Sequence, residues 1–259
     1  MKILILGAGK MGVWLSDALC LQHEVAVFDR DITRLRYVLN TIRLTKLEEI
    51  TDFEPELLIN AVNLQHTQKA FEDVEAFLPE KCIIADIASV KNGLKKYYSG
   101  LSRPFVSVHP MFGPTFASLN NLSNHHAIII SESCESGKHF FKSFFTSLGV
   151  HLHDYTFEEH DQTIAYSLSV PFASTLVFGA NMKHQKAPGT TFEKHLNIAR
   201  GLLSEDDHLL AEILFNKYTA PQLKQIHSSL AALITIVEQR DTAEMQAFLQ
   251  QVRLNLSEG

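Results

Sequence analysis

The first part of the chain alternates short apolar runs with longer stretches in which apolar residues recur at helical spacing. Continuous apolar runs bounded by turn formers are typical of strands in the interior of a sheet. The runs expected to form strands are 3–6, 24–28, 57–62, 83–87, 105–108, 127–130 and 150–153, and helices are expected at 11–21 and 138–148. Because strands separated by helices need right-handed crossovers, this order predicts an α/β fold with a doubly wound, mostly parallel sheet of the Rossmann type.

The pattern changes after about residue 157, where no clear strand pattern remains. Helices are predicted at 159–182, 192–203, 205–215, 221–238 and 242–256. We therefore expect an α/β domain over residues 1–156 and an all-helical domain over residues 157–259. Apolar residues lie on several faces of these helices and exceed what one small domain can bury, which predicts a homodimer that forms through the helical half.

The composition is that of an ordinary soluble protein, with 46% hydrophobic and 20% charged residues. A net charge of −6 with scattered basic residues argues against a nucleic-acid or membrane partner. The three cysteines are widely spaced, so neither a disulfide framework nor a metal site is expected. The first residues lack the features of a signal peptide or a membrane span, and a cytoplasmic location is the expectation.

A glycine-rich motif, G-A-G-K-M-G at residues 7–12, follows the first predicted strand and opens the first predicted helix. In that setting Gly7 allows a tight turn, Gly9 lets the backbone approach a pyrophosphate, and Gly12 lets helix and strand pack closely. The N-terminus of the helix offers free N–H groups to phosphates. The motif predicts a dinucleotide site, with Lys10 and Met11 part of its turn.

Asp29 ends the second predicted strand about 20 residues later, where the dinucleotide fingerprint requires an acid. A carboxylate there accepts hydrogen bonds from the ribose hydroxyls of NAD and repels a 2′-phosphate, so NAD is the predicted cofactor; the adjacent Arg30 can accommodate the phosphate of NADP. Asn63 follows the strand at 57–62 and is a candidate for the nicotinamide ribose, with a plain polar loop as the alternative. Asp86, near the end of the strand at 83–87, completes the candidate cofactor residues.

A histidine followed at once by turn formers stands at the end of the strand predicted at 105–108. The run is His-Pro-Met-Phe-Gly-Pro at 109–114, and its prolines and glycine favour a sharp, rigid turn. His109 is thus expected at the carboxyl edge of the sheet, with no helix to cover it. Ligands bind at this edge in open α/β sheets, and imidazole titrates near neutral pH. His109 is therefore the candidate acid/base group.

A second motif, D-I-A-S-V-K at 86–91, lies at the end of a strand and enters a helix. The strands that end near residues 87 and 108 are expected to be neighbours, which places Ser89 beside His109, where a hydroxyl can orient the imidazole. Capping of the helix is the alternative role for Asp86 or Ser89. His160 and Asp161 begin the helical half, and a structural role at a helix N-terminus is preferred for them over a metal site, since no third ligand stands at fixed spacing.

Four motifs, at 7–12, 86–91, 109–114 and 159–162, occur in an order and at a spacing that resemble the prephenate/arogenate dehydrogenases of tyrosine biosynthesis. The resemblance implies a dinucleotide-binding domain followed by a helical dimerisation domain. It also implies oxidative decarboxylation of prephenate, with NAD, to 4-hydroxyphenylpyruvate and carbon dioxide. In this scheme His109 accepts the proton of the C4 hydroxyl and Ser89 helps to position both.

The chain departs from the family pattern in the helical half. Phe172 stands where family members often carry a further histidine. Many members also carry an arginine that binds a substrate carboxylate, and residues 192–199 of this chain have no arginine at the corresponding position. Lys194, His195 and Arg200 are the substitutes, and Arg200 has the better bidentate geometry. Prephenate and arogenate both remain open as substrates.

Two other classes remain as alternatives. One is a different two-domain dehydrogenase, such as a hydroxyacid dehydrogenase or an imine reductase, which does not explain the run at 109–114. The other is a non-catalytic NAD-binding protein that keeps the fold without the chemistry. The chain ends soon after the last predicted helix, so neither an appended regulatory domain nor a fused mutase domain is expected.

Overall fold

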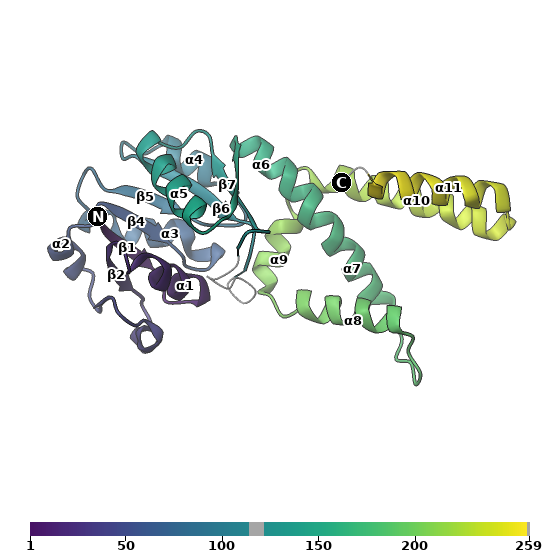
Figure 1. Cartoon of the computed structure of the whole chain (residues 1–259), viewed down its shortest axis with the longest axis horizontal. Helices are drawn as coiled ribbons and strands as arrows, with labels where there is room; N and C mark the ends of the chain where they lie inside the picture. The colour runs from purple at the N-terminus through teal and green to yellow at the C-terminus, as the bar shows by residue number, and fades with distance from the viewer. Residues whose placement is uncertain (114–121, 258–259) are drawn as a thin grey trace. The chain divides into compact units, whose positions relative to one another are not determined.

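A computed structural model describes residues 1–113 and 122–257 (Figure 1). The chain divides into two compact units. The first comprises Met1–Thr163 together with Glu205–Glu212, and the second comprises Ile164–Ser204 with the chain from Ile213 onward. The division therefore falls after Thr163, whereas the sequence pattern placed the end of the first domain at residue 156.

The first unit is built on an eight-stranded sheet with the strand order β3-β2-β1-β4-β5-β6-β7-β8. The strands are β1 (Lys2–Leu6), β2 (Glu24–Phe28), β3 (Ile42–Leu44), β4 (Leu57–Asn60), β5 (Ile83–Asp86), β6 (Phe105–Pro110), β7 (His126–Ile130) and β8 (His151–Tyr155). Neighbouring strands are parallel except for β6 and β7, which pair antiparallel. The prediction of a doubly wound, mostly parallel sheet is confirmed.

Helices cover both faces of this sheet. They are α1 (Lys10–Leu19), α2 (Glu49–Phe53), α3 (Thr67–Val74), α4 (Leu94–Ser99) and α5 (Glu135–Ser147), with 3-10 turns at Ile32–Tyr37, Leu64–His66 and Glu75–Phe77; α6 (Phe157–Ile164) follows β8. Ile3 and Ile5 of β1 belong to the core cluster that contains Trp14 of α1, whereas Leu4 belongs to the cluster that contains Phe71 of α3. Successive residues of β1 are thus buried against opposite faces of the sheet, which explains its unbroken apolar run from Ile3 to Leu6.

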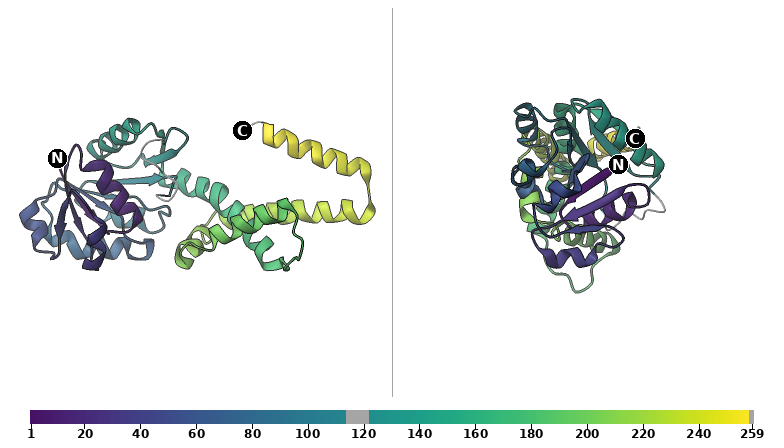
Figure 2. Two further views of the ribbon diagram at one scale, coloured as in Figure 1. Left: turned by 60° about the horizontal axis from the view of Figure 1, so that its bottom comes forward. Right: turned by 90° about the vertical axis from the view of Figure 1, so that its left-hand side faces the viewer.

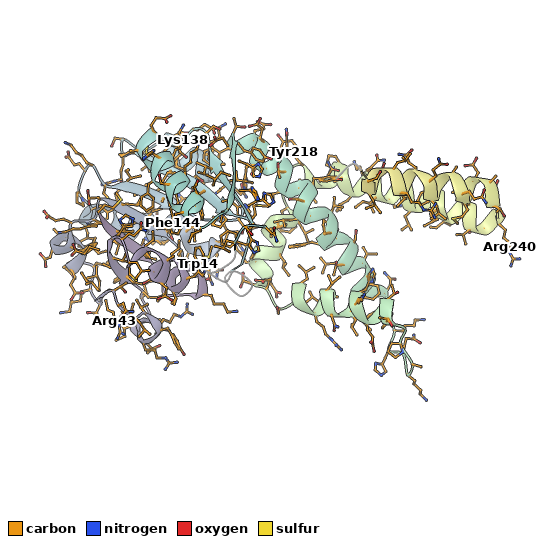
Figure 3. All side chains as sticks on the ribbon, viewed as in Figure 1. Trp14, Arg43, Lys138, Phe144, Tyr218 and Arg240 are labelled. Carbon is orange, nitrogen blue, oxygen red and sulfur yellow. The ribbon has the colours of Figure 1, made fainter. Side chains whose placement is uncertain are left out.

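Helices α1 and α5 contact each other through Trp14 of α1 and Phe144 of α5 (Figure 3). Their rings lie edge to face with centroids 6.3 Å apart. Helix α5 approaches the sheet closely at Gly137, where an added Cβ would lie 2.6 Å from Cβ of Val106. The absence of a side chain there lets α5 lie directly on β6, the strand that carries His109.

The second unit contains helices joined by loops and no strand among its described residues, as predicted. It contains α7 (Val170–Asn181), α8 (Thr190–Leu202), α10 (Thr219–Gln239) and α11 (Thr242–Ser257); most of α9 (Asp207–Leu214) is assigned to the first unit. Helix α7 packs against α8 and α10, and α10 packs against α11. A π-helical segment, Ala165–Ser169, precedes α7.

A tight turn joins α10 to α11. Arg240 adopts the left-handed conformation (φ 54°) and lies at the tip of this hairpin (Figure 3). The N–H of Asp241 donates to the carbonyl of Ile236 across the end of α10, at 3.2 Å. Helix α11 then runs back and diverges from α10 toward its C-terminal end (Figure 2, left). The two helices consequently leave much apolar side-chain surface uncovered by each other.

Candidate active site

The glycine motif forms the turn between β1 and α1, and its three glycines are needed for different reasons. Gly7 has φ +96°, and a Cβ there would lie 3.0 Å from the carbonyl oxygen of Ala61. A Cβ on Gly12 would lie only 1.8 Å from the carbonyl oxygen of Gly7. A Cβ on Gly9 would meet no atom within 4 Å. The packing of the protein itself thus explains Gly7 and Gly12, whereas Gly9 faces open space suited to a phosphate.

Asp29 follows β2 directly and closes one side of this turn. Its Oδ2 accepts a hydrogen bond from the N–H of Ala8 at 2.7 Å, and its Oδ1 accepts from the N–H of Asp31 at 2.8 Å. These bonds hold the carboxylate in one orientation beside the glycine turn. Each carboxylate oxygen has capacity for a further donor, which is the arrangement a ribose diol requires.

A pocket of about 310 Å³ lies along this edge of the sheet. Among the residues that line it are Gly7, Gly9, Asp29, Arg30 and Asn63, so the structure brings together five of the predicted cofactor residues. Lys10 lines an adjoining hollow beside Gly9. Met11 is half-buried against the core of the sheet, and Gly12 is buried in the helix–strand contact.

Asp86, also predicted at the cofactor, has other partners in the structure. Its side chain is fully buried, and its Oδ1 accepts hydrogen bonds from Nζ of Lys91 at 2.5 Å and from the N–H of Ala88 at 3.1 Å. Its Oδ2 accepts from the hydroxyl of Tyr98 at 2.8 Å. Asp86 therefore holds the protein together at the end of β5 rather than presenting a carboxylate to a ligand.

Lys91 links this carboxylate to the strand of the candidate histidine. Its ammonium also donates to the carbonyl oxygen of Val108 at 2.7 Å, one residue before His109. The side chain is fully buried, and burial lowers the pKa of Lys91 despite the opposing attraction of Asp86. The D-x-x-S-x-K motif thus fixes the ends of β5 and β6 relative to each other.

His109 lies within β6 rather than after it, because the strand extends to Pro110 and pairs His109 with Ile128 of β7. The side chain is buried, with 5% of the residue exposed. The expectation that no helix covers this imidazole is wrong, since His160 of α6 packs against it with ring centroids 5.2 Å apart. Of the run 109–114, Pro114 lies outside the described residues.

Hydrogen bonding continues from His109 into α6. Nδ1 of His109 lies 3.0 Å from Nε2 of His160, and Nδ1 of His160 lies 3.3 Å from Oδ1 of Asp161. His160 is completely buried. The sequence interpretation gave His160 and Asp161 a structural role and missed this contact. The signal was present only as an adjacent His-Asp pair at a helix start, and the separation of His160 from His109 along the chain hid the connection.

Burial controls the protonation of both imidazoles. It lowers the pKa of His109 well below the usual value, and the neighbouring His160 and Lys91 lower it further. Burial also lowers the pKa of His160, although its hydrogen bond to Asp161 acts in the opposite direction. Both rings are therefore neutral near pH 7, and a neutral imidazole can accept a proton.

Ser89 lies in the segment between β5 and α4 and is half-buried. Strands β5 and β6 are parallel neighbours, as predicted, so Ser89 and His109 follow adjacent strands at the same edge. Among the described residues, however, no hydrogen bond joins the two side chains. Nδ1 of His109 faces Nε2 of His160 instead.

The predicted substrate-binding residues Lys194, His195 and Arg200 belong to α8 of the helical unit, and all three are exposed. Nδ1 of His195 lies 3.0 Å from the carbonyl oxygen of Thr191, and its ring contacts Phe178. Phe172 lies half-buried on α7. Within the part of the chain that the structure describes, no group of three or more histidine, cysteine or acidic side chains is arranged to hold a metal.

Residues 33–152 match the family model of the prephenate dehydrogenase nucleotide-binding domain. A T-protein from Enterobacter agglomerans is 26% identical over 182 residues, which cover 66% of this chain and 47% of that protein. A probable arogenate/prephenate dehydrogenase from Methanocaldococcus jannaschii is 25% identical over 188 residues, which cover 67% of this chain and 41% of that protein.

Residues 33–152 are thus similar to the nucleotide-binding domain of prephenate dehydrogenase. The resemblance found in the sequence is thereby confirmed, as is the prediction of a nucleotide-binding domain. The matched region spans less than half the length of either curated relative.

Solved dehydrogenases share the fold over nearly the whole chain. Prephenate dehydrogenase from Aquifex aeolicus has a TM-score of 0.83 at 17% identity, covering 99% of both chains. A. aeolicus prephenate dehydrogenase in complex with hydroxyphenyl propionate and NAD+ has a TM-score of 0.81 at 18% identity, covering 100% of this chain and 98% of that one. Arogenate dehydrogenase from Synechocystis has a TM-score of 0.75 at 20% identity, covering 100% and 99%.

Proposed function

We propose that this chain is an NAD-dependent dehydrogenase that converts prephenate to 4-hydroxyphenylpyruvate and carbon dioxide. The observation that carries the proposal is the buried, neutral His109 at the same carboxyl edge of the sheet as the glycine turn and Asp29. Ligands of open α/β sheets bind at this edge. The related A. aeolicus structure, which holds NAD+ and hydroxyphenyl propionate, is consistent with both parts of the proposal.

The residues present fit a dinucleotide. The open space at Gly9 and the N-terminus of α1 suit the pyrophosphate, and the oriented carboxylate of Asp29 suits the ribose hydroxyls. That carboxylate favours NAD over NADP because it would repel a 2′-phosphate. When bound, NAD supplies the acceptor for a hydride.

His109 acts on the substrate hydroxyl in this proposal. The imidazole accepts the C4 hydroxyl proton while the C4 hydrogen leaves as hydride, which turns the alcohol carbon into a carbonyl. Loss of the ring carboxylate as carbon dioxide returns an electron pair to the ring and aromatises it, and the resulting phenolate takes up a proton. The protein contributes the positioned acceptor and a site that holds C4 in place.

Arogenate dehydrogenase activity is the second candidate function. The two substrates differ in the side chain, which carries a keto group in prephenate and an ammonium group in arogenate. Lys194, His195 and Arg200 are the proposed partners of substrate carboxylates. Glu193, exposed in the first turn of α8, offers a carboxylate of the kind that an ammonium group favours.

We propose further that the active form is a homodimer joined through the helical unit. Helix α7 has an apolar sequence but no buried residue. The stretch Phe157–Asn181 even meets the length and composition expected of a membrane span, with 17% of its apolar window buried. Exposed apolar residues continue on α10 and α11. A second copy of the same helices would cover the apolar surfaces of α7, α10 and α11 together. Insertion of Phe157–Asn181 into a membrane would cover only the first of these surfaces.

The decisive test is a set of four assays that combine prephenate or arogenate with NAD+ or NADP+ and follow the absorbance of the reduced cofactor. The expected result is turnover with prephenate and NAD+. His109→Asn should reduce kcat by about 10²–10⁴-fold, the range typical of a lost general base. Log(kcat/KM) should rise with pH through one ionisation below 6.5, the usual histidine pKa from which His109 is lowered.

His227→Asn, at an exposed position of α10, is the matched control and should keep full activity. Turnover with arogenate alone would select the second candidate. Absence of turnover in all four assays, from protein shown to be folded by circular dichroism, would overturn the proposal.

A further inference from the structure

The contact between His109 and α6 has a chemical consequence that depends on counting protons. An ionised carboxylate can only accept hydrogen bonds, and a neutral imidazole has one N–H donor and one acceptor nitrogen. In the chain of contacts from Asp161 through His160 to His109, the identity of the first group therefore fixes the donor and acceptor in each following pair.

The assignment begins at Asp161. Its Oδ1 is an acceptor, so the nitrogen that faces it, Nδ1 of His160, carries the proton. Nε2 of His160 is then the acceptor nitrogen. Nδ1 of His109, 3.0 Å away, must supply the proton of that second hydrogen bond. Nε2 of His109 is left with its lone pair.

We propose that His160 and Asp161 are positioning residues that hold His109 in the tautomer with its proton on Nδ1, so that Nε2 is the nitrogen that accepts the substrate proton. The kinetic part of this inference rests on the proposed dehydrogenase function. The tautomer itself is a property of the protein without substrate.

The arrangement also stabilises His109 after it has accepted a proton. The imidazolium keeps its Nδ1–H hydrogen bond to His160, and the carboxylate of Asp161 lies beyond it. The charged groups nearby are of both signs: Asp161 on α6 raises the pKa of its neighbour His160, whereas Lys91, paired with Asp86 at the end of β5, lowers the pKa of His109. Without His160, the Nδ1–H of a buried ring would lose its acceptor, which costs free energy.

Ser89 is the competing candidate for orienting His109, since the sequence predicted it for that role. The geometry favours His160 because the Nδ1 contact is short and His160 is fully buried. No corresponding hydrogen bond from Ser89 is found in the described residues. The two possibilities make different predictions for substitutions at position 160.

The first experiment reads the tautomer directly by NMR of ¹⁵N-labelled histidine at neutral pH, without substrate or cofactor. The signal of His109 is assigned by its disappearance in His109→Asn. The expected pattern is a protonated Nδ1 and an unprotonated Nε2. A protonated Nε2 would overturn the proposal whether or not the protein turns over prephenate, which separates this failure from a failure of the proposed function.

The second experiment compares two substitutions at position 160. His160→Leu removes the acceptor, and kcat should fall about a hundredfold, in line with the loss of general-base function, with KM for NAD+ unchanged. His160→Gln places an amide oxygen near the position of Nε2 and should restore most of kcat. Equal loss in both variants, or full activity in His160→Leu, would contradict a positioning role.

Asp161→Asn should shift the acidic limb of the kcat/KM profile to lower pH, because the charge that favours the imidazolium is removed.

The chain supplies a matched control for these variants. Nδ1 of His126 and Nε2 of His153 are also 3.0 Å apart, but they lie on β7 and β8 at the exposed end of the sheet. His153→Leu breaks this equivalent pair and should change neither kcat nor the His109 signal. Thermal unfolding followed by circular dichroism shows whether His160→Leu folds. If it does not fold, the kcat of His160→Gln and the tautomer of His109 in the wild-type protein still test the positioning role of His160.

Discussion

At the scale of single residues, burial determines the charge of the two facing imidazoles. His109 and His160 both have a pKa below the usual 6.5, and desolvation is the largest cause for each. Protonation of either imidazole in this buried site therefore lowers the stability of the folded protein. The same environment that keeps His109 available as a proton acceptor therefore makes the fold sensitive to acid.

This coupling predicts how stability depends on pH. The unfolded chain binds protons at these histidines below pH 6.5 while the folded state resists them, so the free energy of unfolding should fall as the pH is lowered through that range. Each histidine contributes at most about 1.4 kcal/mol per pH unit between its folded and unfolded pKa. Urea unfolding between pH 7 and pH 5 measures the slope.

His109→Asn removes one of these two buried histidines, and the free energy of unfolding of the variant should depend less steeply on pH than that of the wild-type protein. If the variant and the wild-type protein lose stability in parallel over this pH range, burial of His109 does not contribute to the acid sensitivity.

The sequence located His109 but not its partner. His109 was found because it ends an apolar run and precedes turn formers, a local pattern that survives in the sequence. His160 lies in a different element, and only the packing of α6 against β6 brings it within 3.0 Å. Asp86 is a different case: an acid at a strand end suggests a ligand contact, and in the structure its two oxygens are bonded to Lys91 and Tyr98, contacts that only the tertiary fold brings together.

At the scale of elements, glycine has two different roles in the turn between β1 and α1: close packing at Gly12 and open space for a ligand at Gly9. Gly12 is required by the close contact with the carbonyl of Gly7, and Gly9 has open space around it. Substitutions at the two positions should therefore have different consequences, although both lie in the same motif.

Gly12→Ala should lower the unfolding free energy by about 1–3 kcal/mol, the usual cost of forcing an extra methyl group into a packed contact. Gly9→Ala should unfold at the wild-type temperature but lose affinity for NAD+, because its methyl group enters the space assigned to the pyrophosphate. Thermal denaturation and titration calorimetry measure the two effects. Unchanged NAD+ affinity in Gly9→Ala would count against the proposed position of the cofactor.

The long elements of the fold were predictable because each carries a sustained pattern. The strands at 24–28 and 105–108 and the helices of the second unit coincide closely with the structure. Strand β3 was missed because it is short and exposes Ile42 and Arg43. Helices α2, α3 and α4 are also short, and a pattern of so few residues does not separate a helix from a turn.

At the scale of the whole molecule, the helical unit presents apolar stripes that one chain does not cover. Leu230, Ile234 and Val237 recur at spacings of four and three along α10, and each is about half exposed. The same spacing places them on one face of the helix. Val252 and Leu256 continue the exposed apolar surface on α11.

The proposed homodimer predicts that a charge on this face disrupts association. The wild-type protein should sediment as a dimer at micromolar concentration, and Ile234→Glu should shift it toward monomer, since a buried unpaired carboxylate is costly. Gln225→Glu is the control, because a residue nine positions earlier lies on the opposite face of α10. A wild-type monomer, or a dimer unaffected by Ile234→Glu, would contradict this interface.

The complete burial of Lys91 makes this lysine a reporter of motion at the carboxyl edge of the sheet. Its two polar contacts, to Asp86 and to the carbonyl oxygen of Val108, and its complete burial shield the amine from any reagent in solution. Amine-directed labels reach it only during moments when the ends of β5 and β6 separate. The rate at which Lys91 is labelled, compared with exposed lysines, thus measures how often the strand that carries His109 opens.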